Sequence, residues 1–69
     1  MNDHVYKTVE ITGSSSDGVT QAIDRAVTKA SQTLRGLDWF EVTEIRGHIE
    51  DGTVAHYQVT LKLGFRLED

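Results

Sequence analysis

An unbroken alternation of residue types near the C-terminus constrains the fold more than any other feature of the chain. Positions of one parity carry Tyr57, Val59, Leu61, Leu63, Phe65 and Leu67. Positions of the other parity carry His56, Gln58, Thr60, Lys62, Gly64 and Arg66. Because side chains of a β-strand point alternately to opposite faces, this segment is predicted to be a strand with one buried face. The same pattern fixes the register, since a slip by one residue would expose every buried side chain.

A second extended segment, Leu37 to Glu50, precedes this strand, which we expect to span Thr53 to Leu67. The dipeptide between them, Asp51-Gly52, is typical of a two-residue hairpin turn. The apolar phase of the earlier strand changes near Thr43-Glu44, which predicts a β-bulge or a strong twist there. Strands of this length reach roughly 50 Å at about 3.3 Å per residue. We therefore expect the hairpin to curl around a single helix or to project past it.

The first half of the chain predicts a strand followed by one amphipathic helix. Residues His4 to Thr12 alternate as a strand does, and Gly13 to Asp17 form a cluster of turn and capping residues, with Ser15 or Ser16 as the expected N-cap. Apolar residues then recur at spacings of three and four, at Val19, Ala22, Ile23, Ala26, Val27, Ala30 and Leu34. This stripe predicts a helix of about five turns with Gly36 at C′, and its alanines predict close packing on the sheet. The predicted fold class is α+β, in the order β-α-β-β, with a three-stranded antiparallel sheet wrapped around one helix.

Composition limits the classes of function. With 69 residues the chain fits one domain, 1–69, near the lower size for a single core, so we expect association of subunits to add stability. The absence of cysteine excludes disulfides and thiolate metal sites, and a net charge of −4 argues against nucleic-acid binding. No apolar run approaches the roughly 18 residues of a membrane span, and the polar N-terminus is unlike a signal peptide. We therefore expect a cytoplasmic protein with no membrane or nucleic-acid partner.

Trp39 is the only tryptophan, and Phe40 follows it. In a strand the two rings point to opposite faces, so one is expected inside the fold and the other on the second face of the sheet, which a single subunit leaves uncovered. Two interpretations of Trp39 follow. It is either a packing residue, inside the fold or between subunits, or a stacking wall for a flat aromatic ligand.

Three polar residues of the hairpin are candidate ligand contacts. The amide of Gln58 offers an acceptor and a donor side by side, which matches the edge of a heterocycle such as the flavin pyrimidine ring; the alternative is a solvated cross-strand residue. Arg46 and Arg66 are suited to bidentate contact with a phosphate. The alternative for each arginine is an ion pair with a nearby glutamate, namely Glu41, Glu44 or Glu68.

Metal and catalytic sites are not predicted. His4, His48 and His56 lack metal-ligand spacing, and although His48 and His56 are expected to face each other across the hairpin, a pair without a third ligand is a poor zinc site. The serines at 14–16 are interpreted as capping residues, not as a nucleophile beside a base. No glycine-rich phosphate loop is present. The chain is therefore not expected to be an enzyme.

Taken together, several segments resemble the bacterial dodecins. The segments are Leu37-Asp38-Trp39-Phe40-Glu41-Val42, Glu44-Ile45-Arg46-Gly47, Tyr57-Gln58-Val59 and Gly64-Phe65-Arg66-Leu67-Glu68. The similarity extends from Val5 to Glu68. Dodecins are small β-α-β-β flavoproteins, so the resemblance implies a hollow homododecamer that binds pairs of flavins, in bacteria chiefly FMN, at two-fold interfaces.

The resemblance also assigns ligands and residues. It implies that two stacked flavin rings lie between symmetry-related Trp39 side chains, that Gln58 reaches the flavin, and that Arg46 and Arg66 lie near the flavin and its phosphate. Riboflavin and FAD are alternatives to FMN. Some bacterial members also bind coenzyme A, for which the candidate contacts here are Tyr6, Lys7, Lys29 and Arg35. The implied function is flavin storage and photoprotective sequestration; the alternative is an oligomeric structural or interaction module in which Trp39 plugs a subunit interface.

Overall fold

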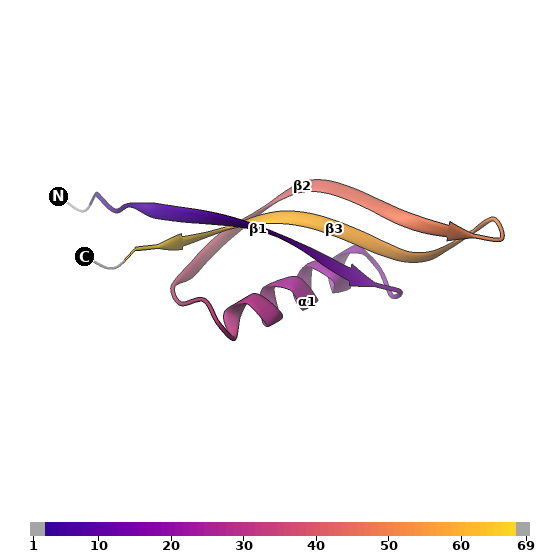
Figure 1. The fold of residues 1–69 in the computed structure, drawn as a ribbon, viewed down its shortest axis with the longest axis horizontal. Helices are drawn as coiled ribbons and strands as arrows, with labels where there is room; N and C mark the ends of the chain where they lie inside the picture. The colour runs from indigo at the N-terminus through magenta and orange to yellow at the C-terminus, as the bar shows by residue number, and fades with distance from the viewer. Residues whose placement is uncertain (1–2, 68–69) are drawn as a thin grey trace.

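The fold follows the predicted order of elements. The computed structural model describes residues 3–67, with strands β1 (Tyr6–Ser15), β2 (Leu37–Glu50) and β3 (Thr53–Arg66) and the helix α1 (Val19–Ser31). The strands form one antiparallel sheet in the order β1-β3-β2, so the strongly alternating C-terminal strand lies in the centre (Figure 1). The predicted fold class is confirmed, and β2 has the predicted bounds. Within residues 3–67 no helix is long and apolar enough to cross a membrane.

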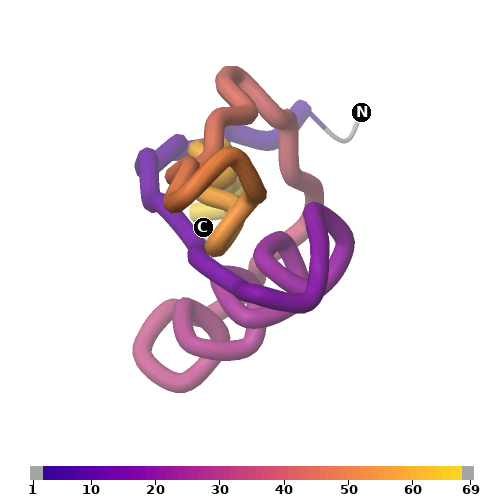
Figure 2. Tube along the Cα trace, turned by 90° about the vertical axis from the view of Figure 1, so that its right-hand side faces the viewer, coloured from indigo at the N-terminus to yellow at the C-terminus, as the bar shows by residue number. Residues whose placement is uncertain are grey.

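The core lies between α1 and one face of the sheet. Seen from the end of the molecule, α1 lies on one side of the sheet, with β2 farthest from it (Figure 2). The buried apolar residues come from β3 and α1 and are Val59, Leu61, Leu63, Ala22, Ala26 and Ala30. A Cβ added at Gly13 of β1 would lie 2.9 Å from the Cβ of Ala26 and would collide with the carbonyl oxygen of Ala22. The helix therefore approaches the sheet closely, as its alanine-rich stripe predicts.

The connection into the helix differs from the prediction. Residues 13–15 continue β1 and pair with β3, where a turn was expected. The N-cap is Gly18, which has no side-chain cap, so Ser15 and Ser16 are both wrong as N-cap predictions. The hydroxyl of Ser15 accepts a hydrogen bond from the backbone N–H of Asp17 at 3.0 Å. Residues 13–15 form strand instead of a turn because α1 approaches β1 closely. This approach requires Gly13, a residue without a side chain, within the strand itself.

The end of the helix also differs from the prediction. α1 has 13 residues and ends at Ser31, with Gln32 as C-cap, so it is shorter than the expected five turns. Leu34 packs against the core from the following loop, which explains why the apolar stripe continues beyond the helix. Gly36 has a positive φ of 74°, but it lies next to β2, and its carbonyl accepts a hydrogen bond from the N–H of Arg66 at 3.2 Å. It is not the C′ residue of α1.

The hairpin of β2 and β3 projects past the helix, which was one of the two predicted outcomes (Figure 1). The molecule consequently measures 55 × 20 × 14 Å. The register of β2 against β3 shifts between Val42 and Glu44, which confirms the predicted bulge. Further shifts lie near both ends of β2. Because α1 packs mainly against β1 and β3, the helix side of β2 beyond Leu37 is left exposed.

Candidate functional site

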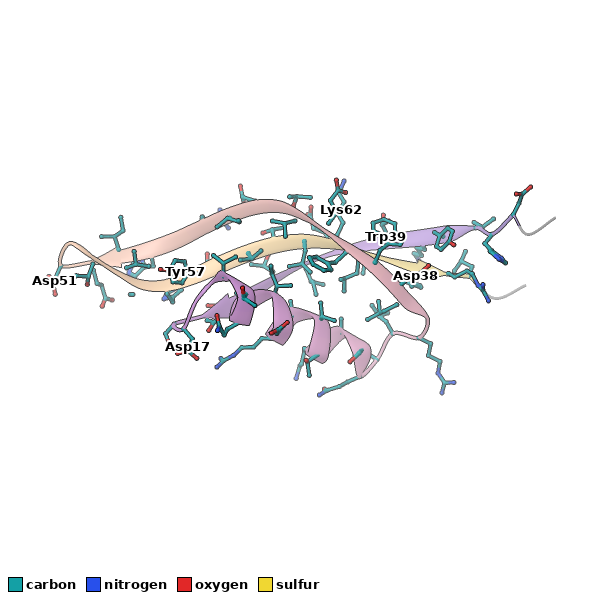
Figure 3. All side chains as sticks on the ribbon, turned by 180° about the vertical axis from the view of Figure 1, so that it is seen from behind. Asp17, Asp38, Trp39, Asp51, Tyr57 and Lys62 are labelled. Atoms are coloured by element: carbon teal, nitrogen blue, oxygen red, sulfur yellow. The ribbon has the colours of Figure 1, made fainter. Side chains whose placement is uncertain are left out.

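The sheet face turned away from α1, which we call the open face, gathers the residues predicted to contact flavin. Gln58 and Arg66 lie on it because the alternate residues of β3 are buried against α1. The register adds Trp39, opposite Gly64, and Arg46, opposite Gln58. In Figure 3 the side chain of Lys62, from the same parity of β3, points away from α1. The structure therefore brings the four predicted residues to one face.

The indole of Trp39 lies over the backbone of β3 at Gly64. A Cβ added at Gly64 would collide with the indole atoms Cε2 and Cζ2 of Trp39. Trp39 nevertheless keeps 42% of its surface exposed. The ring is thus supported from below by the sheet and remains accessible to a ligand. Gly64 was not among the predicted site residues; the signal for it is a glycine inside an alternating strand, which often marks a close approach.

Neither aromatic ring of the Trp39-Phe40 pair is buried within a single chain. The two residues point to opposite faces, as predicted, but Phe40 is 51% exposed, so the expectation that one ring lies inside the fold is wrong. Phe40 lies on the helix side of β2, beyond the strands that α1 covers. It belongs to a row of exposed apolar residues on that side, which we call the apolar row and which consists of Phe40, Val42, Ile45 and Ile49.

The predicted site residues lie at two ends of the open face. Trp39 and Arg66 lie toward the chain termini, whereas Arg46 and Gln58 lie toward the hairpin tip, which Asp51 marks in Figure 3. Gln58 and the Trp39 partner position on β3 are six residues apart in the strand, a separation of roughly 20 Å at about 3.3 Å per residue. One chain therefore offers a stacking surface at one end and an amide beside a guanidinium at the other.

The two arginines of the site are held by weak surface contacts. Arg46 Nη1 lies 3.7 Å from Glu44 Oε1, and the two side chains are 61% and 55% exposed. An ion pair in such a setting contributes at most about 1 kcal/mol to stability. Arg66 Nη1 lies 3.4 Å from His4 Nε2. The glutamate alternative is thus seen for Arg46, whereas Glu68 lies outside the described residues.

The four residues proposed for coenzyme A do not form one site within the chain. Tyr6 lies on the open face opposite Arg66, and Lys7 lies on the helix side of β1. Lys29 lines a cavity of about 510 Å³ between β1 and the C-terminal end of α1. Arg35 lines a different cavity, of about 490 Å³, together with Arg66.

His48 and His56 face each other across the hairpin, as predicted. Their rings stack, with centroids 5.4 Å apart and an interplanar angle of 23°. His48 Nε2 lies 3.6 Å from Glu50 Oε2. No group of three histidine, aspartate or glutamate side chains in the described part of the chain is arranged to hold a metal ion.

Comparison with known proteins identifies the family. The family model described as Dodecin matches residues 5–68. The chain belongs to the dodecin family. A dodecin from Thermus thermophilus is 55% identical over 65 residues, which cover 94% of each chain. The predicted family is therefore confirmed.

Solved dodecins share the whole fold. The structure of dodecin from Streptomyces coelicolor, 67% identical, matches with a TM-score of 0.93 and covers 100% of this chain and 99% of its own. The dodecin from Streptomyces davaonensis, 53% identical, matches with a TM-score of 0.92 and covers 99% of this chain and 100% of its own. Membership of this family supports a small, oligomeric, flavin-binding storage protein in general terms.

Proposed function

We propose that this dodecin binds FMN in pairs within a cytoplasmic homododecamer, and that it stores flavin and suppresses its photochemistry. The observation that carries the proposal is the indole of Trp39, supported on Gly64 and 42% exposed on the open face. A ring fixed before the ligand arrives loses little freedom on binding. Parallel stacking of aromatic rings contributes on the order of 0.5–1.5 kcal/mol beyond area burial. The electron-rich indole can also donate an electron to the excited flavin and take it back, which quenches fluorescence.

The separation of the two ends of the open face supports a site between subunits. A two-fold interface presents the same patch twice, so one Trp39 per chain supplies two facing walls for a stacked pair of flavins. Within one chain, Gln58 lies roughly 20 Å along β3 from the position opposite Trp39. We therefore assign the indole and the amide that meet one flavin to different subunits.

The apolar row supports assembly independently of any ligand. Phe40, Val42, Ile45 and Ile49 are between 36% and 69% exposed and follow one side of β2. Complete burial of such a side chain stabilises an interface by roughly 1.5–3 kcal/mol. A second subunit that covers this row would also strengthen a fold in which residues 3–67 contribute six buried core residues.

FMN is proposed over riboflavin because Arg46 and Arg66 are both on the open face and accessible to solvent. Guanidinium groups bind phosphate in bidentate fashion.

Coenzyme A is the second proposed ligand. Since its candidate contacts, Tyr6, Lys7, Lys29 and Arg35, are not gathered within one chain, such a site would need more than one subunit.

A titration tests the flavin proposal. FMN added to the purified assembly, whose mass is measured by light scattering, should lose its fluorescence until one flavin is bound per chain. Trp39→Ala should weaken binding by roughly tenfold or more, the equivalent of at least about 1.4 kcal/mol, and should restore fluorescence to the flavin that still binds. Arg25→Ala, on the exposed surface of α1, is the matched control and should change neither.

The alternative, in which Trp39 only plugs a subunit interface, predicts the opposite result for the FMN titration. The wild-type assembly would then be intact but would neither bind added FMN nor quench its fluorescence, and Trp39→Ala would change the mass of the assembly without changing any flavin signal. Unchanged affinity and unchanged quenching in Trp39→Ala would overturn the stacking proposal.

A further inference from the structure

The stacked histidines extend the Arg46 end of the open face. On the open face, the pair His48 and His56 is the next pair after Arg46 and Gln58, with Gly47 and Tyr57 between them in the register. Residues two apart in a strand lie on the same face, roughly 7 Å from each other. The two imidazoles, with ring centroids 5.4 Å apart, therefore occupy the positions next to Arg46 on the open face, on the side away from Glu44.

The charge of this cluster depends on the histidines. Its other charged groups are Arg46, Glu44, which lies 3.7 Å from Arg46, and Glu50, which lies 3.6 Å from His48. β1 ends at Ser15, opposite the residue after His56, so it pairs no charged residue with this histidine. With neutral imidazoles the cluster carries two anions and one cation. Protonation of both imidazoles leaves an excess of one positive charge.

We infer that His48 and His56 complete, together with Arg46, a binding site for the phosphate of a flavin mononucleotide, and that this site becomes stronger as pH falls. The inference rests on the proposed flavin function. Imidazole ordinarily changes its charge between pH 5 and 8, and an imidazolium donates charge-assisted hydrogen bonds to phosphate oxygens. Neither glutamate of the cluster can supply such donors. Riboflavin, which has the same rings but no phosphate, gains nothing from them.

The test compares FMN with riboflavin between pH 8 and pH 6. The preference for FMN is the dissociation constant of riboflavin divided by that of FMN. It is measured for the wild-type protein and for the double variant His48→Gln and His56→Gln. Dividing the wild-type preference by that of the variant removes the titration of the phosphate itself. We expect this quotient to rise roughly fivefold from pH 8 to pH 6, with riboflavin affinity unchanged. Arg25→Gln, which removes a positive charge from α1, should behave like the wild type.

Each result of these measurements either supports or overturns the phosphate site. A quotient that stays constant while riboflavin binds both proteins overturns the phosphate site but leaves the flavin function intact. Failure of the wild type to bind either FMN or riboflavin overturns the flavin function and this inference with it. If the double variant does not assemble, NMR of the wild-type imidazoles replaces it. FMN, but not riboflavin, should then raise the pH at which the signals of His48 and His56 titrate, and equal effects of the two ligands overturn the inference.

Discussion

The indole of Trp39 occupies the space above β3 that a side chain at Gly64 would otherwise fill. The two residues are direct partners between β2 and β3, next to a register shift at the start of β2. A glycine in the middle of a strand is ordinarily unfavourable, and here its missing side chain lets the ring rest on the backbone. A stacking surface on the open face therefore depends on Gly64 as much as on Trp39.

Gly64→Ala should displace the indole. The added methyl group would collide with the ring, so we expect a loss of about 1–3 kcal/mol in the free energy of unfolding, the usual cost of overpacking. We also expect FMN affinity to fall roughly tenfold, because the ring leaves its position. Denaturant unfolding, near-ultraviolet circular dichroism and FMN titration measure the three effects.

A double-mutant cycle checks the origin of this loss. In a Trp39→Ala background the methyl group has no ring to meet, so Gly64→Ala should cost at least about 1 kcal/mol less than in the wild type. Equal costs in both backgrounds would contradict a specific contact between the ring and Gly64.

Gly13→Ala should destabilise the fold from the opposite face of the sheet. Its methyl group would collide with the carbonyl oxygen of Ala22 and push α1 away from β1, for an expected loss of about 1–3 kcal/mol or more in the free energy of unfolding. Ser14→Ala is the matched control, since Ser14 is exposed on the open face and should change stability by no more than about 0.5 kcal/mol. Similar unfolding midpoints for the two variants would show that the contact at Gly13 is not limiting.

The parts of the fold that sequence predicts well are those governed by local chemistry. The turn at Asp51-Gly52 and the change of apolar phase near Thr43 determine the bounds of the hairpin and its bulge, because each needs only neighbouring residues to be recognised. The turn brings His48 close to His56, but their direct facing also needs the register shift between His48 and Ile49. The open face of β3 could be assigned from alternation alone, whereas Trp39 and Arg46 share that face only because of the bulge between Val42 and Glu44.

The parts that sequence misses depend on contacts between distant residues. Gly13 to Ser15 have the composition of a turn, but they form strand because α1 must approach that strand closely. Leu34 keeps the helical spacing although it packs from a loop. The role of Gly64 depends on its partner Trp39, 25 residues earlier in the sequence, which no local pattern reveals.

Ile45→Glu should disrupt assembly. Ile45 is 56% exposed in the middle of the apolar row, and a charge buried there without a partner costs several kcal/mol at an interface. Light scattering should show smaller species at micromolar concentration, while circular dichroism stays close to that of the wild type. Gln21→Glu adds the same charge to the exposed surface of α1 and should leave the mass unchanged. An intact assembly of Ile45→Glu would show that the apolar row is not an interface.

Glu44→Gln separates the role of Arg46 in ligand binding from its role in stability. Because both side chains of this pair are more than half exposed, its loss should change the free energy of unfolding by less than about 1 kcal/mol. The carboxylate competes with a phosphate for the guanidinium, so its removal should raise FMN affinity roughly threefold and leave riboflavin affinity unchanged. Arg46→Gln should lower FMN affinity and again spare riboflavin. If both variants keep the wild-type ratio of FMN to riboflavin affinity, Arg46 does not meet the phosphate, and Arg66 at the other end of the open face becomes the residue to replace.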